Sequence, residues 1–161
     1  MERRQNDFLK WNIHKASLKE WTPAMKLAWR TFLRFEAGDY TNEGIRNFQD
    51  FVNDERLQKM FVNGYYHLYV ATENDEIIGM ISRRDQTHIS LLFVDVNYHR
   101  MGVGRALVNY VANELKEMGY TGITVNASPY GLSFYRKIGF KDQGCEVDEH
   151  GIRYTPMSLI F

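Results

Sequence analysis

The chain has little of several features that would point to a specialised class of protein. It holds one cysteine, Cys145, among 161 residues, which excludes a disulfide within the chain and a cysteine-rich zinc site. Its 20 basic residues balance its 20 acidic residues, so its net charge does not favour binding to nucleic acid or to an anionic membrane surface. Its apolar runs are far shorter than a membrane span. These absences leave an ordinary globular protein.

The composition fits one compact domain. Hydrophobic residues make up 44% of the chain and aromatic residues 14%, which argues against disorder. The length is typical of a single domain, so we expect one domain over residues 1–161. No apolar signal segment follows the first residues, Met1 to Asp7, and we therefore expect a cytoplasmic protein.

Apolar periodicity and turn residues predict an α/β fold with a mixed, mostly antiparallel, twisted sheet. We expect about seven strands flanked by about four helices. The predicted strands are residues 11–16, 66–72, 77–83, 87–94, 121–127, 141–147 and 152–160. The predicted helices are residues 18–35, 42–53, 103–118 and 132–137.

The most informative stretch is residues 94–107, where an apolar strand leads through a short turn into a helix. The turn holds Gly102 and Gly104. A glycine turn that opens a helix presents free backbone N–H groups at the positive end of the helix dipole, which suits a phosphate. Glycine also lets a ligand approach the backbone closely. The alternative is a tight connection between strand and helix with no ligand.

Two common nucleotide-binding motifs do not fit this turn. The dinucleotide motif G-x-G-x-x-G requires a third glycine where Leu107 stands. The phosphate-binding loop requires Gly-Lys-Ser/Thr, but Gly104 is followed by Arg105 and Ala106. What remains is G-x-G after a strand, with the polar residue His99 three positions before the first glycine.

A second motif, residues 126–140, reads Asn-Ala-Ser-Pro-Tyr-Gly-Leu-Ser-Phe-Tyr-Arg-Lys-Ile-Gly-Phe. The two motifs, in this order and spacing, resemble those of the GNAT superfamily of acetyl-CoA-dependent N-acetyltransferases. That family carries [Arg/Gln]-x-x-Gly-x-[Gly/Ala] at the pyrophosphate turn and Phe-Tyr-x-x-x-Gly-Phe after the next strand. The resemblance covers roughly residues 66–160. One departure is His99, where the family has Arg or Gln; a neutral His donates one hydrogen bond but loses charge complementarity.

The resemblance implies a site for acetyl-CoA (coenzyme A) along the strand that ends at Val94. Backbone N–H groups near Val94 and Val96 would hold the pantetheine arm, and one would polarise the thioester oxygen. Amides from Met101 to Ala106 would hold the pyrophosphate, with Arg100 and Arg105 adding positive charge. The expected cofactor-binding residues are Phe93, Val94, Val96, His99, Arg100, Met101, Gly102, Val103, Gly104, Arg105, Ala106, Asn126 and Ser128.

The resemblance also implies a catalytic role for Tyr135, which matches the family tyrosine that protonates the departing sulfur. A phenol with a pKa near ~10 and an alkyl thiol near ~8.5 exchange a proton at modest cost. The alternative is a core tyrosine packed with Phe134 and Phe140. The sequence does not identify the general base. The candidates are Glu36, Glu43, His88 and Asp95. No metal is expected.

The charge pattern gives one indication of which acceptor the protein binds. Residues 35–57 hold six acids and two bases. An acidic, aromatic segment in this place would suit a cationic amine, and we expect the acceptor to contact Glu36, Tyr40, Glu43 and His88. The alternative is a solvated helix face.

These observations predict an N-acetyltransferase that moves the acetyl group of acetyl-CoA to a primary amine by direct attack. The acceptor would be an amine on a small molecule or a peptide, and a small cationic amine is favoured. Whether proteins are acetylated depends on how open the acceptor groove is, which the sequence does not show. The alternative from another class is a non-catalytic acyl-CoA-binding sensor or regulatory module. The sequence does not determine the oligomeric state, and a homodimer is one of the states that it allows.

Overall fold

The computed structural model describes residues 11–161; the segment from Met1 to Asp7, for which no signal segment was predicted, lies outside this range. The described chain forms an eight-stranded sheet in the order β1-β2-β3-β4-β5-β8-β6, with β7 paired to β8. The strands are β1 (Asn12–Lys15), β2 (His67–Glu73), β3 (Glu76–Arg84), β4 (His88–Val94), β5 (Gly122–Ala127), β6 (Lys141–Asp142), β7 (Val147–Glu149) and β8 (Ile152–Ile160). The α-helices are α2 (Leu18–Phe35), α3 (Asn42–Val52), α4 (Glu55–Val62), α5 (Val103–Glu117) and α6 (Leu132–Lys137), with short 3₁₀ turns η1 (Ala37–Asp39) and η2 (Val96–Tyr98).

The predicted fold class is confirmed, with two differences in detail. Every strand pair is antiparallel except β4 with β5, which is parallel. Helix α4 was not predicted. The strand predicted over residues 141–147 is wrong as one element, because the chain leaves the sheet after β6 and rejoins it at β7. Within the described residues, no helix combines the length and apolarity that a membrane span requires.

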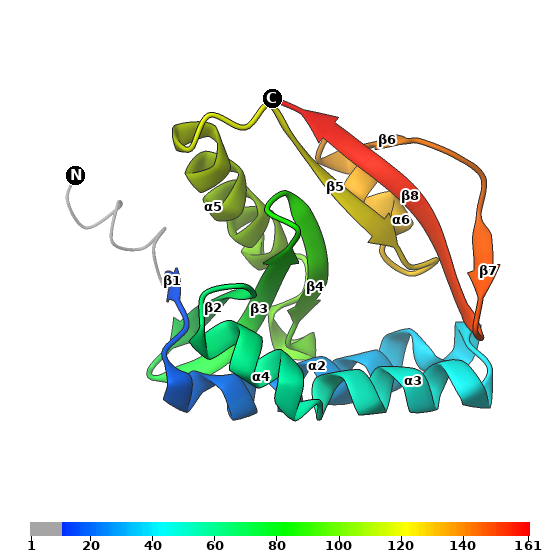
Figure 1. The fold of residues 1–161 in the computed structure, drawn as a ribbon, viewed down its shortest axis with the longest axis horizontal. Helices are drawn as coiled ribbons and strands as arrows, with labels where there is room; N and C mark the ends of the chain where they lie inside the picture. The colour runs from blue at the N-terminus through cyan, green and yellow to red at the C-terminus, as the bar shows by residue number, and fades with distance from the viewer. Residues whose placement is uncertain (1–10) are drawn as a thin grey trace.

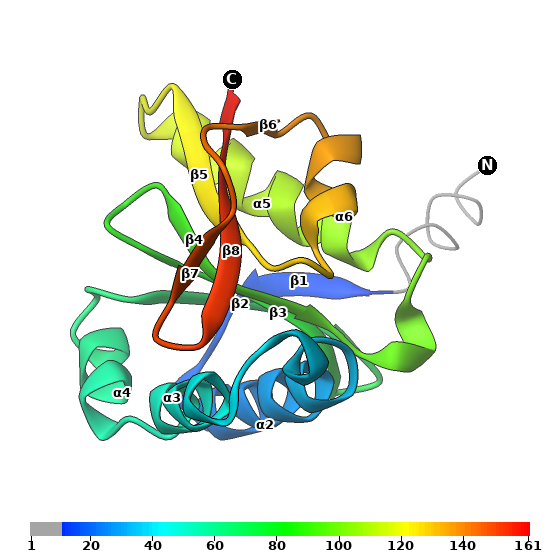
Figure 2. The same cartoon turned by 90° about the vertical axis from the view of Figure 1, so that its right-hand side faces the viewer.

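Two helical layers cover the two faces of the sheet (Figure 2). On one face, α5 buries Leu107, Val111 and Leu115, whose spacing of four residues places them on one side of the helix. On the other face, α2 buries Trp21 and Phe32 against β2, β3 and β4. The central strands of the sheet are therefore buried on both sides.

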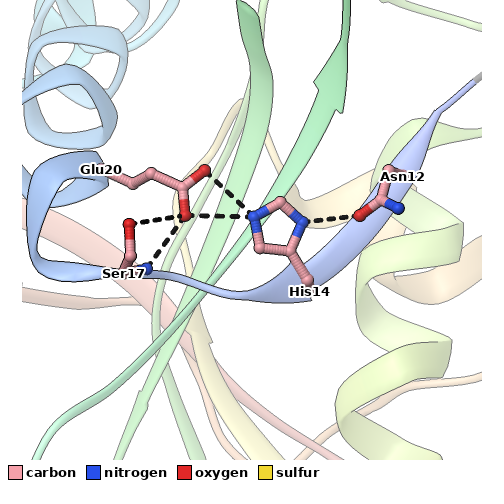
Figure 3. A network of polar contacts seen from close by, with 4 residues as sticks. All are labelled: Asn12, His14, Ser17 and Glu20. Carbon is pink, nitrogen blue, oxygen red and sulfur yellow. Dashed lines mark hydrogen bonds and ion pairs between the residues drawn. The ribbon is translucent and has the colours of Figure 1, made fainter. Parts of the chain in front are cut away.

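Helix α2 is fixed at its start by a polar network with β1 (Figure 3). The backbone N–H of Ser17 donates to the Glu20 carboxylate at 2.9 Å, which caps the first turn. His14 contacts the same carboxylate at 3.0 Å through Nε2 and Asn12 at 2.6 Å through Nδ1. At its other end α2 stops at Phe35, and Glu36 is its C-cap.

Strands β4 and β5 separate after a short parallel contact. They pair only at His88 with Thr124 and at Ile89 with Val125, whereas β4 stays paired with β3 as far as Val94. The two strands then diverge toward the level of α2 and α3 (Figure 1). This separation creates the space in which the functional site lies.

Candidate active site

A cavity of about 1230 Å³ lies between the separated strands. Its walls come from β4, β5, β8, α2, α3 and α6 and from the turn before α5. The predicted residues on its wall are Glu36, Tyr40, His88, Phe93, Val94, His99, Arg100, Gly102, Val103, Gly104, Arg105, Asn126, Ser128 and Tyr135. The structure thus brings the two sequence motifs and part of the acidic segment to one place.

Five predicted residues do not line this cavity: Glu43, Asp95, Val96, Met101 and Ala106. Glu43 is exposed on α3, and Met101 lines a separate, smaller cavity of about 390 Å³. The Ala106 N–H already donates to the Gly102 carbonyl at 3.0 Å as part of the helix. These residues therefore lie outside the wall of the main cavity.

The unpaired edge of β4 forms one wall of the cavity. Residues 90–94 line it, and none of them pairs with β5. Backbone N–H and C=O groups at such an edge are available to an extended ligand, much as they are to another strand. This edge can hold a linear amide-containing chain alongside β4.

The glycine turn presents helix N–H groups to the same cavity. Gly102 takes a left-handed conformation with φ of 88°, which a glycine adopts readily, and α5 begins at the next residue. Val103, Gly104 and Arg105 form the first turn of α5 and line the cavity. First-turn N–H groups have no acceptor within their own helix, so they are free to bind an anion.

His99 connects this turn to the end of β4. Its Nε2 lies 2.7 Å from the Val94 carbonyl oxygen, and its Nδ1 lies 3.5 Å from the Tyr130 hydroxyl. The ring also packs on Phe35 with centroids 4.8 Å apart. In a neutral imidazole, Nε2 then carries the hydrogen and donates a hydrogen bond to the Val94 carbonyl oxygen. The Nε2 side of His99 is thereby engaged within the protein, and its role toward the pyrophosphate stays a prediction.

Glu36, Ser128 and Tyr135 line the cavity from three parts of the chain. Glu36 follows the last residue of α2, Ser128 follows β5, and Tyr135 lies on α6. Burial, opposed in part by a hydrogen bond from Ser128 and reinforced by the charge of Asp39, raises the pKa of Glu36 to about 7. A carboxyl group with this pKa exchanges protons at neutral pH.

Tyr135 is both a packed residue and a cavity residue. Its ring makes edge-on contacts with Phe134 and Phe140, at centroid distances of 5.1 Å and 5.2 Å, and its side chain is only 6% exposed. Burial, and then the negative charge of Glu36, raise the pKa of Tyr135 well above its usual value. Its phenol therefore holds its proton at neutral pH.

The other two predicted base candidates are placed differently. Asp95 accepts a hydrogen bond from the Asn97 N–H at 2.9 Å, pairs with Arg30 at 2.9 Å, and lines the smaller cavity. His88 lies where β4 and β5 meet, and its Nδ1 is 2.8 Å from the Thr124 hydroxyl. Burial and the charge of Arg84 lower the pKa of His88. Of the four predicted candidates, Glu36 is the carboxylate that the structure places in the main cavity.

Sequence reasoning missed several residues of the wall. Those on α3 and β8 carry no motif, whereas Tyr130, Phe134 and Lys137 lie within the second motif. The missed residues include Asn47, Phe48, Phe51, Arg84, Ser90, Tyr130, Phe134, Lys137 and Tyr154.

Comparison with known proteins identifies the family. Residues 36–161 match the model of an acetyltransferase (GNAT) domain, so the chain belongs to the GNAT family. The peptidyl-lysine N-acetyltransferase YjaB of Escherichia coli is 34% identical over 96 residues, which cover 58% of this chain and 63% of YjaB. The uncharacterised N-acetyltransferase YitH of Bacillus subtilis is 32% identical over 93 residues, 56% of this chain and 32% of YitH. The matched segments thus span less than two thirds of these relatives.

Solved structures share the fold over nearly the whole chain. A GCN5-related N-acetyltransferase from Rhodopseudomonas palustris has a TM-score of 0.81 at 20% identity, with 93% of this chain and 95% of that chain covered. The PaiA N-acetyltransferase of Thermoplasma acidophilum, solved in complex with coenzyme A, has a TM-score of 0.78 at 20% identity, covering 94% and 99%. At these identities the similarity establishes the fold alone.

Proposed function

We propose that this protein transfers the acetyl group of acetyl-CoA to a primary amine by direct attack. The observation that carries the proposal is that Glu36, with a pKa near neutrality, and the protonated phenol of Tyr135 share the cavity beside the unpaired edge of β4. Membership of the GNAT family supports the same reaction. The named coenzyme A complex of PaiA supports the choice of cofactor.

The residues present fit coenzyme A. The edge of β4 at residues 90–94 would hold the amide groups of the pantetheine arm, and Asn126 and Ser128 would face it from β5. The first-turn N–H groups of α5 would hold the pyrophosphate, while Arg100 and Arg105 would add positive charge. When bound, acetyl-CoA would supply an activated acetyl thioester.

Glu36 serves as the general base in this proposal. An amine acceptor arrives mostly as an ammonium ion, which must lose a proton before its nitrogen can attack a carbonyl carbon. Glu36 can accept that proton when its carboxyl is ionised, and with a pKa of about 7 a large share of it is ionised at neutral pH. Its negative charge also attracts the cationic acceptor, and Tyr40 contributes an aromatic face nearby.

Tyr135 serves as the general acid. As the carbon–sulfur bond breaks, the electron pair goes to sulfur, and the Tyr135 hydroxyl gives that sulfur a proton. The charge of Glu36 raises the pKa of Tyr135, so protonation of Glu36 by the amine lowers the pKa of the phenol. The nitrogen releases its second proton to the phenolate, which restores Tyr135, and Glu36 returns its proton to solvent.

The test is calorimetric titration with acetyl-CoA, coenzyme A and ATP, followed by a thiol-release assay over a panel of amines. We expect selective binding of the two coenzyme A species and thiol release with cationic amines. If only neutral or acidic amines react, the prediction of a cationic acceptor is wrong. Coenzyme A binding with no thiol release on any amine would instead support a sensor. Absence of coenzyme A binding would contradict the whole proposal. A cytoplasmic location and a homodimer remain predictions.

A further inference from the structure

Glu36 belongs to a short connecting segment, residues 36–41, which joins α2 to α3 through η1. The Asp39 N–H donates to the Glu36 carbonyl oxygen at 3.0 Å. The Tyr40 N–H donates to the Ala37 carbonyl oxygen at 3.1 Å. Because these hydrogen bonds make the connecting segment compact, the contacts at its two ends decide where the Glu36 carboxyl group lies.

The first end of the connecting segment is fixed by three aromatic rings. Phe35, the last residue of α2, stacks on Tyr130 with ring centroids 5.1 Å apart, and it packs on His99 with centroids 4.8 Å apart. The Tyr130 hydroxyl lies 3.5 Å from His99 Nδ1, so each of the three side chains contacts the other two. We call Phe35, His99 and Tyr130 the aromatic cluster.

The aromatic cluster joins three parts of the site. Phe35 immediately precedes Glu36, and His99 lies in the turn that leads to α5. Tyr130 lies in the loop between β5 and α6, the helix that carries Tyr135. His99 and Tyr130 line the cavity, whereas Phe35 does not. Any effect of Phe35 on a ligand is therefore exerted through its neighbours.

The second end of the connecting segment is fixed by the turn between β7 and β8, more than a hundred residues later in the chain (Figure 1). The Thr41 N–H donates to the Gly151 carbonyl oxygen at 3.1 Å. A Cβ atom on Gly44 would lie 2.3 Å from the same carbonyl oxygen, which is too close for a carbon atom. Glycine at position 44 therefore lets the main chain of α3 meet this turn directly.

The pKa of Glu36 reports how deeply its carboxyl group lies. Burial is the largest cause of the pKa of about 7, so a connecting segment that moved outward would let the pKa fall toward the ordinary 4.5. The titratable groups that influence it or respond to its charge are Asp39, Tyr40 and Tyr135. Burial raises the pKa of both tyrosines, so they keep their protons while Glu36 titrates.

We propose that Phe35 is a positioning residue, which holds Glu36 in the cavity at a fixed place relative to the turn before α5. The contact between Gly44 and Gly151 has the same effect from the other end of the connecting segment. If either end is loosened, the Glu36 carboxyl group moves toward water and away from the place where it serves the reaction. The catalytic part of this inference rests on the proposed acetyl transfer, whereas the position of Glu36 does not.

The experiment uses Phe35→Leu, which keeps an apolar side chain but removes the stacked ring, and Gly44→Ala, which forces the second contact apart. Phe61→Leu is the matched control, because Phe61 is half-buried like Phe35 and stacks on Trp21 near the other end of α2, with centroids 5.0 Å apart. Phe35→Tyr keeps the ring and should retain wild-type values. Thermal unfolding shows which variants are folded.

The first measurement needs no acetyl transfer. It is the gain in stability that Glu36→Gln brings above pH 7, measured by urea denaturation in each background. Wild type and Phe61→Leu should show the full gain, and Phe35→Leu and Gly44→Ala should lose most of it, because a carboxyl group already in water ionises at no cost to folding. A gain that is absent in wild type, or equal in all folded backgrounds, would overturn the inference.

The second measurement is the pH profile of kcat. In Phe35→Leu and Gly44→Ala the rate at high pH should fall by about tenfold to a hundredfold, since a small misplacement of a catalytic group has an effect of this size. The midpoint of the profile should move below that of wild type. The Kd of coenzyme A should stay near wild type, because His99 is also held by the Val94 carbonyl oxygen at 2.7 Å.

The outcomes separate this inference from the proposed function. Weaker coenzyme A binding in Phe35→Leu with an unchanged kcat and midpoint would assign Phe35 to the cofactor turn alone, and it would overturn the inference while leaving acetyl transfer intact. If the wild-type protein releases no thiol with any amine, the proposed function is wrong. The stability measurement then still decides whether Phe35 positions Glu36.

Discussion

The carboxylate of Glu36 and the phenol of Tyr135 face the same cavity, and the charge of the first raises the pKa of the second. One residue follows α2 and the other lies on α6, so the relationship is created by the fold. Two titrating groups whose environments give them different proton affinities are the requirement for paired acid and base chemistry. The first three predictions test this pair.

Replacing Tyr135 by phenylalanine should lower kcat by about 10²–10⁴-fold, because the ring still fills its packed site but no longer carries a proton. Coenzyme A binding, measured by calorimetry, should stay close to wild type. Tyr110→Phe is the control, since Tyr110 packs on Tyr69 on the α5 side of the sheet. Unchanged turnover in Tyr135→Phe would remove the residue from the mechanism.

The rate should rise with pH through the titration of Glu36, because the base must be ionised to accept a proton. Its pKa of about 7 predicts the midpoint of that rise. Glu36→Gln should lose most activity and the rise with it, while Glu43→Gln, on the exposed face of α3, should keep both. A Glu36→Gln variant with a wild-type pH profile would assign the base to another group.

The same substitution should stabilise the protein at alkaline pH. An unfolded glutamate ionises near 4.5, whereas folded Glu36 keeps its proton up to about 7. Ionisation therefore favours the unfolded state increasingly between these values and fully above the higher one. After a discount for partial exposure, Glu36→Gln should gain about 2 kcal/mol in free energy of unfolding above pH 7, and almost nothing below about pH 4.5. Urea denaturation in both ranges checks this; a gain that is equal in the two would contradict the shifted pKa.

The sequence predicted elements best where periodicity and turn residues agreed. The bounds predicted for α2, α6 and β8 match the structure. Helix α4 was missed because it has only eight residues and its apolar face is short, although Asp54 does cap it by accepting from the Arg56 N–H at 2.8 Å. The predicted strand over 141–147 is interrupted at residues 143–146, where the chain bends at Gly144 and Cys145 between β6 and β7.

The site was predictable where one short segment builds it. The glycine turn is of this kind, because a local strand–turn–helix pattern predicts it, whereas the place of the cofactor along β4 followed from the family resemblance. The pairing of Glu36 with Tyr135 and the contact of Gly44 with Gly151 depend on how distant segments pack, which no local pattern encodes. His99 shows the same limit, because its engagement by Val94 and Tyr130 is visible only in the folded chain.

The network at the start of α2 should contribute measurably to stability. Burial alone would raise the pKa of Glu20, but hydrogen bonds from Ser17 and His14 together lower it. Glu20→Gln should therefore cost about 1 kcal/mol at neutral pH, because the amide keeps one hydrogen-bond acceptor but loses the charge that strengthens the bonds from Ser17 and His14. In the wild type this contribution is present above the ordinary pKa value of 4.5 and is lost as the pH falls through the lowered pKa.

Glu43→Gln, which removes an acid from the first turn of α3, separates the helix-dipole effect from the hydrogen bonds. Equal losses in urea denaturation for the two variants would mean that the network adds nothing beyond the dipole.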